Sequence, residues 1–281
     1  MKPPAALPAA EVERRVREAV AAIRARSALT PHVGLTLGSG LGGVIDRLES
    51  AAVFAVTELP HWPPPTVVGH AGRLALGRWG DTPLVALAGR SHRYEGHPLD
   101  RVTFAVRVMA ALGARALIFT NAVGALNREF QKADLMLATD HINFIGKRGL
   151  LDDAELRARG AARPVARCYS PRLNQRLAAA AARAGVPLHR GVLMGGLGPS
   201  YETAAEVRMG AAIGADAACM STVHEVALAA ELGCEAASLS CITNRATGLA
   251  DGPLSHAEVT EIADLGARKI ERILDQLFRA A

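Results

Sequence analysis

The chain has 281 residues, with 32 lysines and arginines against 27 aspartates and glutamates, for a formal net charge of +5. Half of the residues are hydrophobic and 21% are charged, which excludes a largely disordered chain, and the length allows a substantial core. Aromatic residues make up only 4%, so we do not expect the exposed stacking platforms of a single-stranded nucleic-acid binder. The charge balance suits an anionic small ligand better than DNA, and without an apolar run of about 18 residues we expect no membrane span.

The cysteines and the first residues bear on location. Cys168, Cys219, Cys234 and Cys241 form no C-x-x-C pair, which indicates free thiols rather than a zinc site or disulfides. The N-terminal apolar stretch is too short, and too often interrupted by proline, for a signal peptide. We therefore expect a cytoplasmic protein.

The first half of the chain alternates between helical and extended patterns. Val12, Val16 and Val20 repeat at helical spacing, which predicts an amphipathic helix over about residues 9–26. A second helix is expected over Arg101–Leu112. Short apolar runs predict strands at His32–Leu37, Val53–Thr57, Leu74–Leu76, Leu84–Ala88 and Ala116–Thr120.

The second half continues this alternation. Helices are predicted over Arg172–Ala184, Thr203–Ile213, Val223–Leu232 and His256–Phe278, and strands over Gly191–Met194, Ala217–Met220 and Ala236–Thr243. An irregular loop is expected over about residues 146–168. The alternation predicts a single α/β domain over residues 1–281, with a mostly parallel sheet covered by helices on both faces.

A glycine-rich turn, residues 38–43, follows the first predicted strand. Its small residues allow backbone N–H groups to approach an anion, and the Ser39 hydroxyl adds a donor. The turn also satisfies G-x-G-x-x-G, and Glu58 follows Gly38 by 20 residues, the spacing of a dinucleotide-binding fingerprint. However, only nine residues separate Gly43 from Val53, fewer than the roughly 10–12 that a crossover helix needs. Besides an anion site and a dinucleotide-binding site, the third interpretation is a tight turn that binds no ligand.

Two further polar clusters follow predicted strands. Arg90 and His92 alternate after one strand end, so a planar guanidinium and an imidazole can face the same phosphate. The stretch Thr120–Ala125 exposes backbone N–H groups among small residues. Taken alone, each cluster is also consistent with an ordinary loop.

The remaining clusters lie in the second half. Tyr201 offers a ring face and Glu202 a carboxylate, a pair that can hold a flat heterocycle bearing an N–H group. Glu202 could equally serve only to favour a helix N-terminus. Met220, Asn244 and His256, taken singly, are more typical of a core, a turn and a helix surface than of a binding site.

Together and in this order, these segments resemble the trimeric class of purine nucleoside phosphorylases, a family that includes 5′-methylthioadenosine phosphorylases. The resemblance is also carried by Gly69–Leu74, Asp140–Asn143 and Gly214–Val226, and it spans about residues 32–260. It implies reversible phosphorolysis of a purine nucleoside to the free base and α-ribose 1-phosphate, without a metal or organic cofactor. It further implies a homotrimer and a phosphorylase-type α/β fold, with a central, mixed, twisted sheet flanked by helices.

The resemblance assigns roles to individual residues. The residues expected to bind phosphate are Ser39, His70, Arg90, His92, the backbone N–H of Ala122, and Ser221. Those expected to bind ribose are Tyr94, Met220 and His256. Those expected to bind the purine are Tyr201, Glu202 and Asn244. Of these, His92, Glu202, Asn244 and His256 are expected to act in catalysis.

The substrate expected from the resemblance is a 6-oxopurine nucleoside such as inosine or guanosine. Asn244 supports this, because methylthioadenosine phosphorylases place an aspartate there. The alternatives are an adenine-type phosphorylase acting on methylthioadenosine or adenosine, a dinucleotide-binding oxidoreductase, and a purine-binding protein without catalytic activity.

Two departures from the family pattern stand out. Residues 147–168 lack the Arg-Phe segment whose phenylalanine reaches a neighbouring subunit's ribose site, which leaves that contact open. His224 occupies a position where proline is common.

Overall fold

The computed structural model describes residues 7–38, 40–64, 72–146, 151, 155, 167–249 and 256–279, and for residues 256–260 it describes the backbone alone. Most of the predicted irregular loop over about 146–168, together with Ser39 and His70, lies outside these residues. No helix of the described residues is both long and apolar enough to cross a membrane.

Nine strands of the described residues form one sheet, in the order β2-β3-β4-β1-β5-β8-β7-β6-β9, and β9 also pairs with β5. Their bounds are β1 (Val33–Leu37), β2 (Glu49–Ala55), β3 (Arg73–Trp79), β4 (Thr82–Ala88), β5 (Ala116–Ala125), β6 (Leu135–Asn143), β7 (His189–Gly195), β8 (Ala217–Cys219) and β9 (Glu235–Arg245). Because β9 returns to β5, the last five strands close on themselves and leave no free edge between them.

The sheet is mixed, as the family resemblance implies, and among the described strands parallel pairs outnumber antiparallel ones by five to four, so the expected parallel majority is small. β1 is parallel to β4 and β5, and β5–β9, β6–β7 and β7–β8 are also parallel. The pairs β2–β3, β3–β4, β5–β8 and β6–β9 are antiparallel. For the first two of these pairs the reason is that β2, β3 and β4 follow one another with only the 3-10 turn over Val56–Glu58 between them among the described residues, so consecutive strands run in opposite directions.

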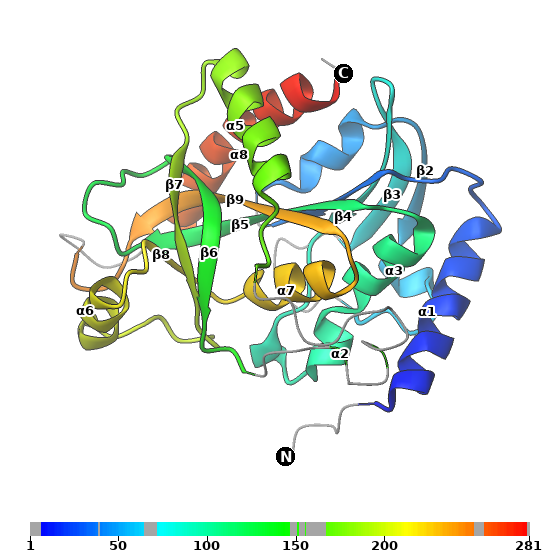
Figure 1. Cartoon of the computed structure of the whole chain (residues 1–281), viewed down its shortest axis with the longest axis horizontal. Helices are drawn as coiled ribbons and strands as arrows, with labels where there is room; N and C mark the ends of the chain where they lie inside the picture. The colour runs from blue at the N-terminus through cyan, green and yellow to red at the C-terminus, as the bar shows by residue number, and fades with distance from the viewer. Residues whose placement is uncertain are drawn as a thin grey trace.

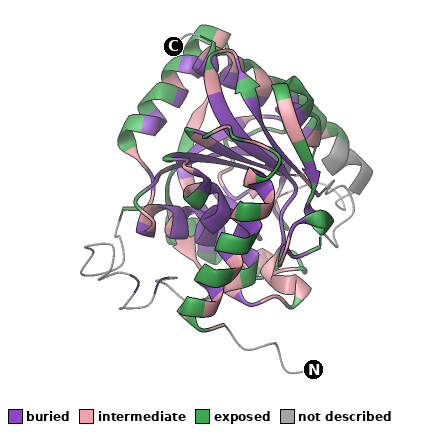
Figure 2. Ribbon diagram, turned by 90° about the vertical axis from the view of Figure 1, so that its right-hand side faces the viewer, coloured by how far each residue is buried: buried purple, intermediate pink, exposed green. Residues whose placement is uncertain are grey.

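Helices cover both faces of the sheet (Figure 1). Their bounds are α1 (Ala9–Arg24), α2 (Leu99–Val102), α3 (Phe104–Leu112), α5 (Pro171–Ala184), α6 (Ala204–Ala212), α7 (Val223–Glu231) and α8 (His256–Phe278), with short 3-10 turns η1 (Gly42–Arg47), η2 (Val56–Glu58) and η3 (Arg93–Glu95). α5 and α8 bury one cluster of side chains against the sheet, and α1, α3 and α7 bury another against its other face. Figure 2 shows the consequence, with buried residues concentrated in the strands and exposed ones on the outer faces of the helices.

Helix ends follow local chemistry. α5 begins where Ser170 Oγ accepts the Leu173 N–H at 3.1 Å with Pro171 at the first position, and it ends at Gly185 in the left-handed conformation. The helix predicted over Arg101–Leu112 is instead split into α2 and α3 at Thr103, whose hydroxyl donates to the Leu99 carbonyl at 2.7 Å. Such back-bonding by threonine competes with a continuous helix.

The dinucleotide-binding interpretation of the glycine-rich turn is not supported by the fold. After β1 the chain enters the short turn η1 and then β2, which pairs antiparallel with β3 at the far edge of the sheet. A dinucleotide fingerprint requires a helix that leads into a neighbouring parallel strand. Glu58 is exposed and lies 3.4 Å from Arg26, in a surface ion pair.

Candidate active site

The glycine-rich turn and the residues after β4 meet where β1 and β4 end. Leu37 stands opposite Ala88 in the parallel pair, and the Gly89 N–H donates to the Leu37 carbonyl at 3.0 Å. The Gly38 N–H donates to Thr120 Oγ1 in β5, also at 3.0 Å. A Cβ at Gly38 would lie only 2.7 Å from the Thr120 carbonyl oxygen, so this approach needs glycine. Three of the predicted clusters are therefore side by side.

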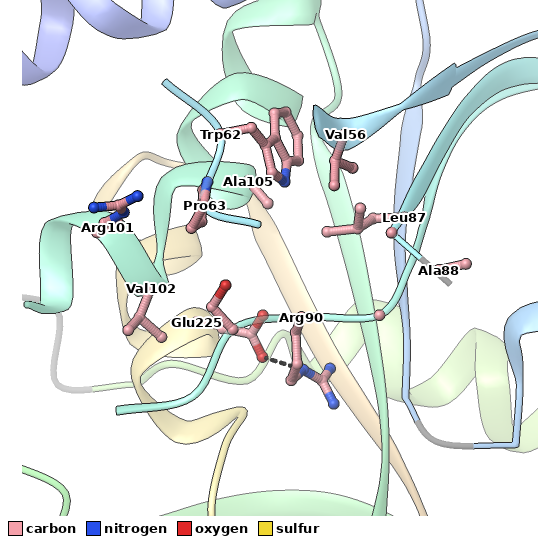
Figure 3. Close-up of a pocket in the computed structure, with 13 residues that line it drawn as sticks. Val56, Trp62, Pro63, Leu87, Ala88, Arg90, Arg101, Val102, Ala105 and Glu225 are labelled. Carbon is pink, nitrogen blue, oxygen red and sulfur yellow. Dashed lines mark ion pairs between the residues drawn. The ribbon is translucent and has the colours of Figure 1, made fainter. Parts of the chain in front are cut away.

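Arg90 is held from two directions at this point. Its Nε lies 3.1 Å from Glu225 Oε2, and its Nη1 donates to the Thr120 carbonyl at 2.8 Å. The side chains of Arg90 and Glu225 are 4% and 2% exposed. Burial raises the pKa of Glu225, while the Arg90 guanidinium acts in the opposite direction. Figure 3 shows this ion pair at one end of a pocket that Trp62 and Leu87 also line.

His92 and Tyr94 follow Arg90 and stack on each other. Their ring centroids are 4.8 Å apart and the rings are nearly parallel, at 16°. His92 Nδ1 lies 3.0 Å from Glu95 Oε1. Because a carboxylate only accepts, this contact places the proton of the neutral imidazole on Nδ1. The stack and the hydrogen bond together fix the plane of the His92 ring.

The predicted ribose residues Tyr94 and Met220 meet at Gly198. A Cβ at Gly198 would collide with Met220 Sδ and would lie 3.0 Å from Tyr94 Cδ1. Gly198 has a φ of +70° and begins the Gly198–Thr203 loop, so this loop lies directly on the two side chains. The structure thus brings together the segment that follows β4, the Gly198–Thr203 loop and Met220.

Ser221 lies at the start of α7 and is 5% exposed. Its hydroxyl is 3.1 Å from that of Thr222, a residue with φ +69° that turns the chain into the helix. The N-terminus of a helix carries partial positive charge and unpaired N–H groups, which favour an anion. Ala122 lies in β5, two residues after the Thr120 carbonyl that holds Arg90.

Asn244 near the end of β9 and Glu202 on the loop after β7 are the residues predicted to bind the purine. Asn244 is 7% exposed, accepts from Thr243 Oγ1 at 2.9 Å and donates to the Arg245 carbonyl at 3.0 Å, which orients its amide. Glu202 Oε1 would lie 3.0 Å from a Cβ at Gly196, so the carboxylate sits against that backbone. Tyr201, in contrast, is 55% exposed.

Cys219 contacts both Ser221 and Gly196: its thiol donates to the Ser221 carbonyl at 3.1 Å, and its carbonyl accepts the Gly196 N–H at 2.8 Å. Burial raises the pKa of the Cys219 thiol to about 12, with smaller effects from the Ser221 carbonyl, Arg90, Glu202 and Glu225. A thiol with this pKa is neutral at pH 7 and adds no charge. Among the described residues, no group of three or more His, Cys, Asp or Glu side chains could hold a metal ion.

The side chains of three predicted residues are not described. Ser39 and His70 lie outside the described residues, and His256 opens α8 with its backbone alone described. A Cβ at Gly40 would lie 2.9 Å from Ala263 Cβ, so α8 reaches the glycine-rich turn two helical turns after His256.

The sequence analysis missed two residues of this region. Glu225, the partner of Arg90, is buried in the first turn of α7, where a charge among apolar residues was a usable signal. Asn121 is 2% exposed, and its Oδ1 and Nδ2 have no hydrogen-bond partner within the described part of the chain. Its Cα would be 3.0 Å from a Cβ at Gly38, so a buried amide lies beside the glycine-rich turn.

Comparison with known proteins agrees with this arrangement. Residues 32–279 match the phosphorylase superfamily. Purine nucleoside phosphorylase 1 of Bacillus subtilis (strain 168) is 42% identical over 250 residues, which cover 89% of this chain and 92% of that protein. Purine nucleoside phosphorylase of Bos taurus is 38% identical over 257 residues, covering 88% of each chain.

A solved structure is similar over almost the whole fold. Isoform 2 of purine nucleoside phosphorylase from Schistosoma mansoni, in complex with cytosine and ribose-1-phosphate, has a TM-score of 0.86 and 31% identity. The match covers 95% of this chain and 96% of that one. The family match and these relatives agree with the mixed sheet and with the buried arginine at the strand ends. The chain belongs to the purine nucleoside phosphorylase family of pentosyltransferases.

Proposed function

We propose that the chain catalyses the reversible phosphorolysis of 6-oxopurine ribonucleosides and deoxyribonucleosides, such as inosine and guanosine. The products are the free purine and α-ribose 1-phosphate or its deoxy form, a reaction of purine salvage. The observation that carries the proposal is the buried guanidinium of Arg90, fixed beside the glycine-rich turn, and the oriented amide of Asn244 in β9 supports it.

Phosphate is proposed to bind around Arg90. A guanidinium binds two oxygens of a phosphate in a fork, and the helix N-terminus at Ser221 adds hydrogen-bond donors. The proposal includes His92 and the N–H of Ala122, and also Ser39 and His70. Its electrostatic basis is the buried positive charge of Arg90, which lies beside the glycine-rich turn.

The chemistry follows from where charge develops. Breaking the bond between C1′ and N9 makes the sugar resemble an oxocarbenium ion and leaves negative charge on the purine. A phosphate held below the sugar stabilises that cation and is positioned to attack it. We assign the sugar to Tyr94, Met220 and His256. Tyr94 and Met220 meet at Gly198 and can fix the ribose above the phosphate.

Base choice is assigned to Glu202 and Asn244, with Tyr201 on the ring face. Glu202 can accept from N1–H of a 6-oxopurine, and the amide of Asn244 can donate toward N7 as charge arrives there. The adenine-type alternative requires an acceptor facing the 6-amino group. The Asn244 carbonyl accepts from Thr243 and its NH₂ donates to the Arg245 carbonyl, which leaves one N–H of the amide to donate to a 6-oxopurine.

The proposal also covers assembly, location and cofactors. We propose a homotrimer, because large apolar side chains are exposed on the segments after β6 and β7 and on α6: Phe144, Leu197, Tyr201, Met209 and Ile213. Exposed apolar groups of this kind mark interaction surfaces. Phosphate is the co-substrate, without a metal or organic cofactor, and four free cysteines suit a reducing cytoplasm.

The test is hypoxanthine release from inosine with and without phosphate, alongside guanosine, adenosine and methylthioadenosine. Phosphate-dependent release with inosine and guanosine preferred supports the proposal. Phosphate-dependent release only from the adenine nucleosides transfers it to the adenine-type alternative. Binding of hypoxanthine without turnover of any of the four would leave a purine-binding protein.

A further inference from the structure

We propose that Glu225 is a positioning residue that aims the guanidinium of Arg90 at the bound phosphate. The proposal rests on the assignment of Arg90 to phosphate in the proposed function. It adds a residue on α7 that touches no substrate and acts only through Arg90.

The geometry is that of a clamp made by two separate elements. Arg90 follows β4, Glu225 lies on α7 and the Thr120 carbonyl belongs to β5. Glu225 Oε2 forms an ion pair with Nε at 3.1 Å, and the Thr120 carbonyl accepts a hydrogen bond from Nη1 at 2.8 Å. Because these contacts engage two different nitrogens of a planar group, together they limit how the guanidinium can turn.

The first turn of α7, which carries Glu225, is fixed in the fold by hydrogen bonds and packing. The Val226 N–H donates to the Thr222 carbonyl at 2.9 Å, and Val223 and Val226 are fully buried in the cluster that α7 forms with the sheet. Glu225 follows Ser221 by four residues, about one helical turn. The residue that orients the arginine therefore lies in the first turn of α7, and Ser221, which is assigned to phosphate, lies just before that turn.

Stability alone gives little reason for this pair. Removing two charges from water offsets much of their mutual attraction, and apolar side chains in the same space often stabilise a fold as well or better. A long arginine side chain has many rotamers, and an anion site benefits when the productive one is already selected. Orientation is therefore the property that the buried pair supplies most directly.

His224, the neighbour of Glu225, contributes no compensating charge. It is 1% exposed, and burial lowers its pKa to about 3, with Arg90, His92, His141 and Arg93 acting in the same direction. The imidazole is therefore neutral at pH 7. Glu225 is left as the ionisable partner that α7 provides to Arg90.

Two substitutions separate orientation from charge. Glu225→Gln keeps the length of the side chain and an oxygen acceptor but removes the charge. Glu225→Asp keeps the charge but withdraws it from Arg90 by one methylene. If Glu225 acted by charge alone, Gln would have the larger effect and would strengthen phosphate binding, because a negative charge near the anion is lost.

The positioning role predicts the reverse order. In steady-state assays with inosine, Glu225→Asp should raise the KM for phosphate about tenfold, equivalent to about 1.4 kcal/mol. Glu225→Gln should change it less than threefold, and the KM for inosine should stay within twofold in both variants. Equal or larger effects of Gln, or parallel changes in both KM values, would overturn the inference.

A control lies on the same helix. Glu231 is 6% exposed and accepts the Leu151 N–H at 2.9 Å, so Glu231→Gln also alters a buried carboxylate of α7. It should leave the KM for phosphate within twofold of the parent. A similar rise in this control would mean that general disturbance of α7, and not the aim of Arg90, explains the Glu225 data.

The inference can fail separately from the proposed function. Absence of phosphate-dependent turnover in the parent protein would refute the proposed function itself. If the parent turns over and Arg90→Lys raises the KM for phosphate, but Glu225→Asp does not, only the inference is refuted. Should the variants not fold, the parent still provides a readout. In a crystal structure of the parent grown without phosphate, Glu225 Oε2 should lie within about 3.5 Å of Arg90 Nε, and a guanidinium turned away from Glu225 would contradict the clamp.

Discussion

Arg90 is 7% exposed and Tyr201 is 55% exposed, although both are assigned to one small-molecule site. On the phosphate side, the Thr120 carbonyl of β5 and the Glu225 side chain of α7 hold the arginine in place. On the base side, Tyr201 and Glu202 stand on the loop that links β7 to α6. Arg90 is therefore held in one orientation before a ligand binds, whereas Tyr201 on the proposed base side stays open to solvent.

The largest expected effect comes from breaking the preorganised side. Arg90→Ala should raise the KM for phosphate roughly ten- to a hundredfold, because a charged, forked hydrogen bond contributes about 1.5–3 kcal/mol. Hypoxanthine affinity should be nearly unchanged, since the base side does not use this residue. Initial rates at varied phosphate, with calorimetric titration of hypoxanthine, measure both.

Arg93→Ala is the matched control for that experiment. Arg93 is a neighbouring arginine whose Nη1 donates to the His97 carbonyl rather than toward the site. Its loss should shift the KM for phosphate less than threefold. An unchanged phosphate KM in Arg90→Ala would show that the anion binds elsewhere.

The base side is tested by Asn244→Asp. A carboxylate facing O6 places two acceptors together in a desolvated pocket, which costs about 1–3 kcal/mol. kcat/KM for inosine should fall at least tenfold, and activity on adenosine should rise relative to inosine. Glu202 limits the rise, since adenosine has no N1–H. If the ratio of the two kcat/KM values is the same in variant and parent, base selection lies outside Asn244.

A pH effect on stability is expected from His224, next to the anion clamp. The folded state keeps this imidazole neutral down to pH about 3, whereas the unfolded chain binds a proton below about pH 6.5. Stability should therefore fall as the pH falls from 6.5, by about 2 kcal/mol at pH 5. The variant His224→Leu has a side chain of similar size and no ionisable group. Its free energy of unfolding, measured in urea at about pH 6.5 and about pH 5, should lack this loss. Equal pH dependence in both proteins would mean that His224 is protonated in the fold.

The smallest expected effect concerns His256. By resemblance this residue bonds the 5′-hydroxyl, so His256→Ala should lower kcat/KM for inosine more than for 5′-deoxyinosine, by about the 0.5–1.5 kcal/mol of a hydrogen bond. An equal loss for both substrates would remove this role.

The elements that sequence predicted best are those with a strong local pattern. α8 has the predicted bounds His256–Phe278, because its apolar residues recur at helical spacing without a break. β6 was missed, since its buried first half is followed by Asp140 and His141, which read as a polar motif and not as a strand. Local patterns also missed the closure of β9 onto β5, a pairing of strands more than 100 residues apart.

The candidate site shows the same division. Arg90, His92 and Tyr94 were identified because several chemical groups follow one strand end. The Arg90–Glu225 pair could not be inferred, because 135 residues separate its members and only the packing of α7 on the sheet brings them together. For the same reason, nothing in the sequence around Asn121 revealed that its amide would be buried beside Gly38.

The most direct test of the central claim is a crystal structure of the parent protein with phosphate and hypoxanthine. The account predicts phosphate within hydrogen-bond distance of Arg90, with the guanidinium still paired to Glu225 as it is without ligand. It predicts hypoxanthine between Glu202 and Asn244, with Tyr201 less exposed than before. Phosphate bound away from Arg90, or an Arg90 that leaves Glu225 to reach it, would contradict a preorganised anion site.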